Sequence, residues 1–130
     1  MAATHPFTLA LIAHDGKKDD MVRFACEHLE ELRDVRLVAT ATTGALLRAQ
    51  LGLDVESMAS GPQGGDLQIG ARIVDGRIDG VIFFRDPLTS HPHEPIQAVL
   101  KVCDVHDVPL ATNRASALLL IRSLHNELTQ

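Results

Sequence analysis

A glycine-rich turn that carries one carboxylate is the stretch of this sequence best suited to chemistry. It reads Ser60-Gly61-Pro62-Gln63-Gly64-Gly65-Asp66, at a point where an extended segment is expected to give way to a helix. Glycine reaches positive φ and has no side chain, so backbone N–H groups in such a turn can face a small anion directly. The turn could equally be a surface loop in which Asp66 caps the following helix. The local sequence leaves both interpretations open.

Other polar residues follow three more apolar segments of the chain. His14, Asp15 and Lys18 come after the first segment, the Thr40–Gly44 run after the second, and the stretch 86–93 after the fourth. In an open parallel sheet, ligands bind at the carboxyl ends of the strands. We therefore expect these four polar stretches to meet at one edge.

The side chains brought together in this way suit a small phosphate ester that has a removable proton on the carbon next to a carbonyl group. The Lys18 ammonium group, the Thr40–Gly44 run and the Ser60-Gly61 pair provide charge, hydroxyls and flexible backbone for phosphate. The remaining candidates are the carboxylates Asp15, Asp66 and Asp86 and the histidines His14 and His93. A carboxylate can remove a proton α to a carbonyl when a donor such as histidine stabilises the enediolate, and partial desolvation raises the pKa of the base.

Each of these residues also has a purely structural interpretation. Asp15 and Lys18 could be solvated loop charges, and Thr43 could cap a helix. The pair His91 and His93 does not indicate a metal site, because no set of cysteines or carboxylates stands at metal-ligand spacing beside it. Neither a P-loop nor a GxGxxG pattern is present, which disfavours nucleoside triphosphates and dinucleotides. The functional interpretation depends on the agreement of four stretches.

The apolar pattern predicts five successive strand and helix units. Apolar runs without alternation indicate strands buried on both faces, and helical spacing indicates the segments between them. The expected strands are Thr8–Ala13, Val35–Ala39, Asp54–Ala59, Gly80–Phe84 and Val108–Thr112. The expected helices span Met21–Leu32, Ala45–Leu51, Leu67–Val74, Ile96–His106 and Ser116–Leu128. The fold class is therefore α/β: one three-layer αβα domain over residues 1–130, Rossmann-like, with an open, mostly parallel five-stranded sheet.

Composition excludes several function classes. The net charge is −5 and the chain has no Trp or Tyr, which argues against nucleic acid as a partner. No apolar run approaches the length that spans a membrane, and the first residues do not resemble a secretory leader, so a cytoplasmic location is expected. The two cysteines, Cys26 and Cys103, are interpreted as reduced core thiols.

Taken together, the polar stretches resemble methylglyoxal synthase from about Leu9 to Asn113. The matching motifs are Ala13-His14-Asp15 with Lys18, Ala39-Thr40-Ala41-Thr42-Thr43-Gly44, Ser60-Gly61-Pro62-Gln63-Gly64-Gly65-Asp66, Phe83-Phe84-Arg85-Asp86-Pro87-Leu88, Pro92-His93-Glu94-Pro95 and Val108-Pro109-Leu110-Ala111-Thr112-Asn113. The resemblance implies a homohexameric carbon–oxygen lyase without metal or organic cofactor. Such an enzyme converts dihydroxyacetone phosphate to methylglyoxal and inorganic phosphate.

The resemblance also implies roles for individual residues. Asp66 matches the catalytic base, His93 a histidine that binds substrate oxygens, and Asp86 a second active-site aspartate. Substrate or phosphate binding is implied for His14, Asp15, Lys18, Thr40, Thr42, Thr43, Ser60 and Gly61.

Two departures from the family pattern concern the same site. Ala41 stands where the family usually has glycine, and the stretch before Ile96 is one residue short, so that an aspartate after Pro95 is missing. Glu94 is the residue that could replace this carboxylate.

Two other functions remain possible from the sequence. The fold also resembles the allosteric domain of carbamoyl phosphate synthetases, which would make the chain a regulatory ligand-binding module. An isomerase would share the enediolate intermediate but would return glyceraldehyde 3-phosphate.

Overall fold

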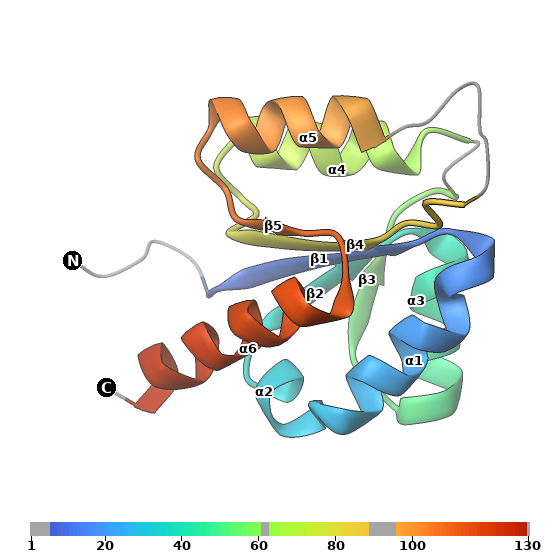
Figure 1. The fold of residues 1–130 in the computed structure, drawn as a ribbon, viewed down its shortest axis with the longest axis vertical. Coiled ribbons are helices and arrows are strands. Elements are labelled where there is room, and N and C mark those ends of the chain that lie inside the picture. Colours follow the sequence, from blue (N-terminus) through green and yellow to red (C-terminus); the bar gives the residue numbers. More distant parts are fainter. Residues whose placement is uncertain (1–5, 61–62, 89–95, 130) are drawn as a thin grey trace.

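Five parallel strands form one open sheet in the computed structural model, which describes residues 6–60, 63–88 and 96–129 (Figure 1). The strands are β1 (Thr8–Ala13), β2 (Arg36–Ala39), β3 (Val55–Ser57), β4 (Gly80–Phe84) and β5 (Leu110–Ala111). Their order across the sheet is β3-β2-β1-β4-β5, and each neighbouring pair is parallel. The predicted α/β class with a parallel five-stranded sheet is confirmed.

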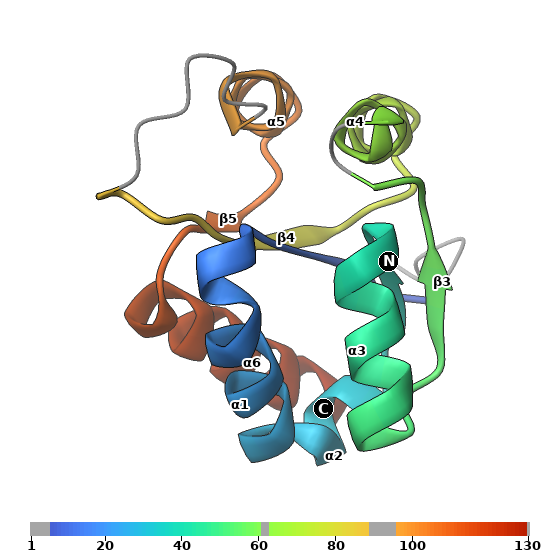
Figure 2. The same cartoon turned by 90° about the vertical axis from the view of Figure 1, so that its right-hand side faces the viewer.

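Helices cover both faces of this sheet, which gives three layers (Figure 2). The short 3₁₀ segment η1 (Asp15–Lys17) precedes the helices α1 (Lys18–Glu27), α2 (Leu29–Arg33), α3 (Ala41–Leu51), α4 (Gly65–Val74), α5 (Ile96–Val105) and α6 (Arg114–Thr129). Helices α1, α2, α3 and α6 lie on one face, and α4 and α5 lie side by side on the other. Right-handed crossovers produce this division, because the connections run outward from β1 in one direction and from β4 in the other.

The alternation of side chains along β1 divides the core into two halves. Leu9 and Leu11 face the layer of α1, α3 and α6, whereas Ala10 and Ile12 face α4 and α5. All six residues of β1 are buried, as expected for the central strand of a covered parallel sheet. The central strand therefore contributes to both cores at once.

The connections from β1 run towards one edge of the sheet and those from β4 run towards the other. The junction between β1 and β4 determines where polar side chains gather. Ala13 pairs in register with Phe84, so both strands end at the same level. The next residues, His14 and Arg85, therefore leave the sheet side by side at the topological switch point.

Several predicted element boundaries were wrong. One continuous helix was expected up to Leu32, but the backbone leaves the helical region at His28 (φ −128°, ψ 34°). The N–H of His28 donates to the carbonyl of Ala25, three residues earlier, instead of continuing the α-helical pattern. Strands β3 and β5 are shorter than expected because they pair with only one neighbour each, over three and two residues. Helix α6 begins at Arg114 rather than Ser116, since the Asn113 side chain accepts the N–H of Ser116.

The two cysteines lie in different environments, and neither forms a disulfide. Cys103 is buried in the core beneath α5, where burial and the nearby Asp104 charge raise the pKa of its thiol to about 11. Cys26 is exposed, so the expectation of a core position was wrong there: α1 turns Met21, Phe24 and Ala25 inward and Cys26 outward. The raised pKa disfavours a thiolate at Cys103.

Within the described ranges, no helix is long and apolar enough to cross a membrane.

Candidate active site

The threonine-rich run after β2 begins a helix instead of forming the expected loop. Thr40 is extended (φ −65°, ψ 157°) and occupies the N-cap position, and α3 starts at the next residue. The residues involved are small enough to pack directly against the sheet: a Cβ on Gly44 would lie 2.6 Å from the Ser57 hydroxyl. The start of α3 therefore presents first-turn N–H groups at the sheet edge, with the hydroxyls of buried Thr40 and Thr43 3.5 Å apart.

The glycine-rich turn folds around the Ser60 carbonyl. That oxygen accepts the N–H of Gln63 at 3.0 Å and of Gly65 at 2.8 Å. Gly64 adopts φ 95°, a conformation that glycine alone reaches at little cost, and it occupies the N-cap position of α4. The interpretation of Asp66 as the cap is therefore wrong, because Asp66 is the second residue of the helix. Gly61 lies outside the described residues.

The backbone of Ala59 joins the starts of α3 and α4. Its N–H donates to the Gln68 side chain at 2.7 Å, and its carbonyl accepts the N–H of Ala41 at 3.4 Å. Gly65 packs directly on this carbonyl: a Cβ added there would lie 1.9 Å from the Ala59 oxygen. The two helix N-termini are thus held against one short piece of backbone.

Asp66 is a buried carboxylate at this junction, with 5 % of its surface exposed. Burial raises its pKa above the ordinary value of 3.8, and a positive charge on His14 works in the opposite direction. A carboxylate with a raised pKa is a stronger base once it is ionised. Asp66 therefore has the chemistry of a proton acceptor close to an imidazole.

His14 is held in a defined orientation at the end of β1. Its backbone N–H donates to the Phe84 carbonyl at 3.0 Å. Its ring nitrogen Nδ1 accepts the backbone N–H of Asp86 at 3.1 Å. The ring also meets Phe83 edge-on, with centroids 5.3 Å apart. Because Nδ1 accepts, the neutral ring carries its hydrogen on Nε2, which makes Nε2 the donor nitrogen.

The other charged candidates surround the same strand ends. The Asp86 carboxylate accepts the N–H of Leu88 at 3.0 Å and lies close to Gly16, where an added Cβ would be 3.0 Å from Oδ2. Lys18 folds back onto β1, with Nζ 3.2 Å from the Ala13 carbonyl and 2.6 Å from the Asp15 carboxylate. The Asp15 side chain is fully exposed and forms this ion pair with Lys18 at the surface.

Comparison with known proteins matches this fold and site. Residues 20–112 match the family model described as "MGS-like domain". Methylglyoxal synthase of Cupriavidus taiwanensis is 57% identical over 120 residues, which cover 92% of this chain and 90% of that protein. The protein of the same name from Burkholderia mallei strain SAVP1 is 57% identical over 122 residues, covering 93% and 94%. This chain belongs to the methylglyoxal synthase family.

A solved structure agrees with this assignment. The crystal structure of methylglyoxal synthase from Elizabethkingia anophelis superposes with a TM-score of 0.85 at 43% identity, covering 89% of this chain and 77% of that one. Similarity at this level extends over nearly all of the sheet and its helices. The architecture described above is therefore that of the methylglyoxal synthase family.

The structure brings together most of the side chains that the sequence singled out. His14, Asp66 and Asp86 meet at the switch point, and Thr40, Thr43 and Ser60 meet around the Ala59 peptide. Thr42 is exposed in the first turn of α3. His93 and the shortened stretch that contains Glu94 lie outside the described residues.

Gln68 was missed by the sequence analysis. Its carboxamide oxygen receives the Ala59 N–H nine residues earlier in the chain. Nothing in the local sequence indicates this contact, because it forms only after the glycine turn has reversed the chain.

The described ranges contain no group of three or more histidine, cysteine, aspartate or glutamate side chains placed to hold a metal ion.

Close packing at Gly65 yields a first prediction. Gly65→Ala forces the α4 start away from Ala59, because the backbone oxygen at 1.9 Å cannot rotate aside as a side chain could. We expect a loss of about 1–3 kcal/mol in the free energy of unfolding. Denaturation by urea, followed by circular dichroism, measures it. In the matched control, Gly70→Ala on the same helix, the nearest atom to the new methyl is 4.0 Å away. That change should stabilise the helix by about 0.5–1 kcal/mol, and equal effects at both glycines would contradict the packing argument.

Burial of Asp66 yields a second prediction. Its pKa is higher in the folded protein than in the unfolded chain, so the folded protein binds more protons between the two values and stability falls as pH rises through them. Asp66→Asn removes the cost of burying the charge. The variant should melt at a higher temperature than the parent at pH 7 to 8, and the difference should shrink towards pH 4. Melting curves across this range test the slope, and Asp54→Asn at an exposed position is the control. A melting difference that is the same at every pH would rule the explanation out.

Proposed function

We propose that this chain is a carbon–oxygen lyase that converts dihydroxyacetone phosphate to methylglyoxal and inorganic phosphate. The observation that carries the proposal is the buried carboxylate of Asp66, which has a raised pKa and lies close to His14 beside two helix N-termini. The names of the relatives support the same reaction. An enediolate mechanism needs a base, a donor for the developing oxyanion and an anchor for phosphate.

The phosphate anchor is assigned to the α3 start and the residues around it. First-turn N–H groups and the positive end of the helix dipole favour an anion. Lys18 adds an ammonium group that already lies at the end of β1. The proposed phosphate ligands are Lys18, Thr40, Thr42, Thr43, Ser60 and Gly61.

Asp66 is proposed to begin the reaction by removing a proton from the hydroxymethyl carbon. The electron pair of the broken C–H bond forms the carbon–carbon double bond of an enediolate, and negative charge develops on the former carbonyl oxygen. His14 can donate to this oxygen through Nε2, because Asp86 N–H occupies Nδ1. The roles of His93, as a second donor, and of Asp86, as an orienting group, come from the resemblance.

Phosphate then leaves by β-elimination. The C–O bond to phosphate breaks and its electron pair departs with the phosphate oxygen, while the hydroxyl group of the enediolate loses its proton to the departing phosphate and becomes the aldehyde carbonyl. The enolate that remains takes back, at its terminal carbon, the proton held by Asp66, which gives methylglyoxal. Each atom of the substrate is accounted for in the two products, and no external oxidant or reductant is needed. The proposal also includes a cytoplasmic homohexamer that works without metal or organic cofactor.

The decisive assay follows methylglyoxal and phosphate together after dihydroxyacetone phosphate is added to the purified protein. We expect both products in equal amounts, above the slow elimination in buffer alone. Glyceraldehyde 3-phosphate in place of methylglyoxal would indicate an isomerase. Phosphate binding without any product would leave the regulatory module as the function.

Asp66→Asn tests the role of the base directly. The amide is nearly the same size but cannot accept the proton, so turnover should fall by about 10²–10⁴-fold while inorganic phosphate still binds. Turnover comes from the assay above, and phosphate binding from isothermal titration calorimetry. Asp75→Asn, at the other end of the same helix, is the matched control and should keep full activity. Unchanged turnover in Asp66→Asn would remove Asp66 from the role of base.

A further inference from the structure

Gln68 supplies a hydrogen bond where the edge strand β3 ends. Beyond the paired residues of β3, the Met58 N–H still donates to the Ala39 carbonyl of β2 at 2.7 Å. The next N–H, that of Ala59, donates to the Gln68 side chain at 2.7 Å. An N–H donor requires an acceptor, so the oxygen of the carboxamide faces Ala59. Gln68 therefore holds the first backbone group beyond the sheet.

Ala59 in turn contacts the starts of both helices that face the candidate site. Its carbonyl accepts the N–H of Ala41, the first residue of α3, at 3.4 Å. Gly65, the first residue of α4, packs on the same carbonyl so closely that there is no room for a Cβ atom. Asp66 follows Gly65 directly and is buried. A shift of Ala59 would therefore move Asp66 relative to the start of α3.

A second polar contact joins α4 to β3 one turn further from the site. Arg72 donates to the Glu56 carboxylate at 2.6 Å, and this hydrogen bond lowers the pKa of that carboxyl group. Gln68 and Arg72 are four residues apart, so they lie on the same face of the helix. Arg72 holds a side chain of β3, whereas Gln68 holds the backbone next to the site. Breaking each contact in turn separates attachment of the helix from positioning of the site.

The Gln68 contact lies near the surface, where it affects geometry more than stability. The side chain is exposed, and a hydrogen bond that water can replace contributes little to the free energy of unfolding. Catalytic geometry is far more sensitive, because misplacing a reacting group by about 1 Å lowers the rate by about 10²-fold. A contact of this kind can therefore govern turnover while the fold barely depends on it.

We propose that Gln68 is a positioning residue for the proposed reaction: its carboxamide oxygen holds the Ala59 backbone and thereby fixes Asp66 relative to the start of α3. The inference rests on the proposed function, in which Asp66 removes the proton while phosphate is held at the start of α3. The three-carbon substrate spans both groups, so their separation decides whether the carboxylate reaches the hydroxymethyl carbon. Gln68 needs no contact with the substrate for this role.

Steady-state kinetics with dihydroxyacetone phosphate test this role through two substitutions at Gln68. Gln68→Met keeps the length of the side chain and removes the acceptor. Its kcat should fall by about 10–100-fold, while KM and the affinity for inorganic phosphate stay close to those of the parent. Gln68→Glu keeps an oxygen acceptor and should restore most of kcat. Its added negative charge should raise the pKa of Asp66, so the acidic limb of the pH profile should move to higher pH.

Two matched variants show what a purely structural contact would do. Arg72→Met breaks the contact with Glu56 on the same face of α4. Gln50→Met makes the same replacement as Gln68→Met at an exposed position near the end of α3. Both controls should keep the kcat of the parent. An equal loss of kcat in Gln68→Met and Arg72→Met, no loss in Gln68→Met, a rise in KM alone, or failure of Gln68→Glu to restore kcat would each overturn the inference.

The backbone amide signals in NMR spectra keep this test separate from that of the reaction. If the parent protein forms no methylglyoxal, the proposed function fails before any variant is compared. Gln68→Met should still shift the Ala41 amide signal and speed hydrogen exchange at Ala59. Arg72→Met should change neither. Equal responses in the two variants, or none in Gln68→Met, would show that Gln68 does not hold the start of α3.

Discussion

The close contact between Gly65 and the Ala59 peptide is the constraint on which the candidate site depends. The backbone of one residue, Ala59, accepts the N–H of Ala41 through its carbonyl and donates its own N–H to the Gln68 side chain, which ties the starts of α3 and α4 together. The first-turn N–H groups of both helices have no partner within their own helix. Because both helix starts pack on the backbone of Ala59, two sets of donors and two positive helix ends face the same small volume. The absence of a side chain at Gly65 makes this approach possible.

The same junction explains why an acidic side chain can be buried there. Asp66 sits in the first turn of α4, where the helix dipole favours negative charge, yet desolvation still raises its pKa. The fold thus keeps a carboxylate in an environment that makes this group more basic and makes the folded protein less stable. Such a compromise between stability and chemistry is common at functional sites. The imidazole of His14, oriented by the backbone N–H of Asp86, lies close to this carboxylate.

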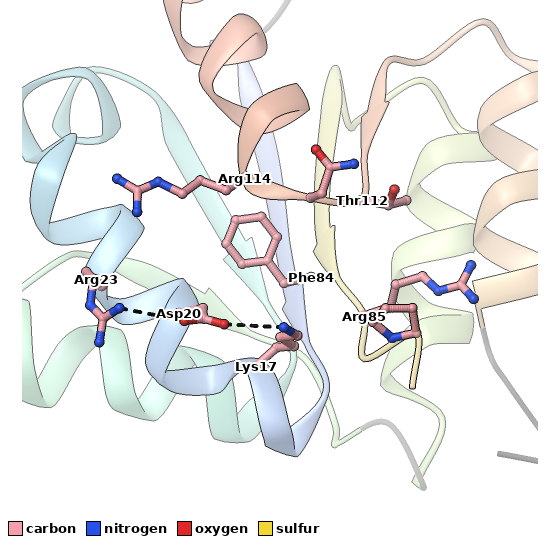
Figure 3. Close-up of a pocket in the computed structure, with 9 residues that line it drawn as sticks. Lys17, Asp20, Arg23, Phe84, Arg85, Thr112 and Arg114 are labelled. Atoms are coloured by element: carbon pink, nitrogen blue, oxygen red, sulfur yellow. Dashed lines mark ion pairs between the residues drawn. The ribbon is translucent and has the colours of Figure 1, made fainter. Parts of the chain in front are cut away.

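The edge formed by the carboxyl ends of the strands has a different character on its two sides. Towards α3 and α4 it presents backbone donors, hydroxyls and the buried Asp66. Towards α1 and α6 lies a pocket of about 560 Å³ whose lining includes Lys17, Arg23 and Arg114 (Figure 3). The switch point creates both sides, because β1 and β4 send their connecting segments in opposite directions.

Much of this arrangement followed from the sequence alone. Continuous apolar runs identified the five strands, since a parallel sheet covered on both faces leaves no alternation of polar residues. The polar residues after each strand identified the edge that carries chemistry. Local sequence did not determine how the polar runs fold: the threonine run became the first turn of α3, and Asp66 moved from a cap position into the helix. These outcomes depended on contacts with Ser57, Ala59 and Ser60, which come close only after the chain has folded. The contact of Gln68 with Ala59 and the pocket between α1 and the start of α6 depended on tertiary structure entirely, because the residues that form them lie apart in the sequence and meet only when the chain packs on the sheet.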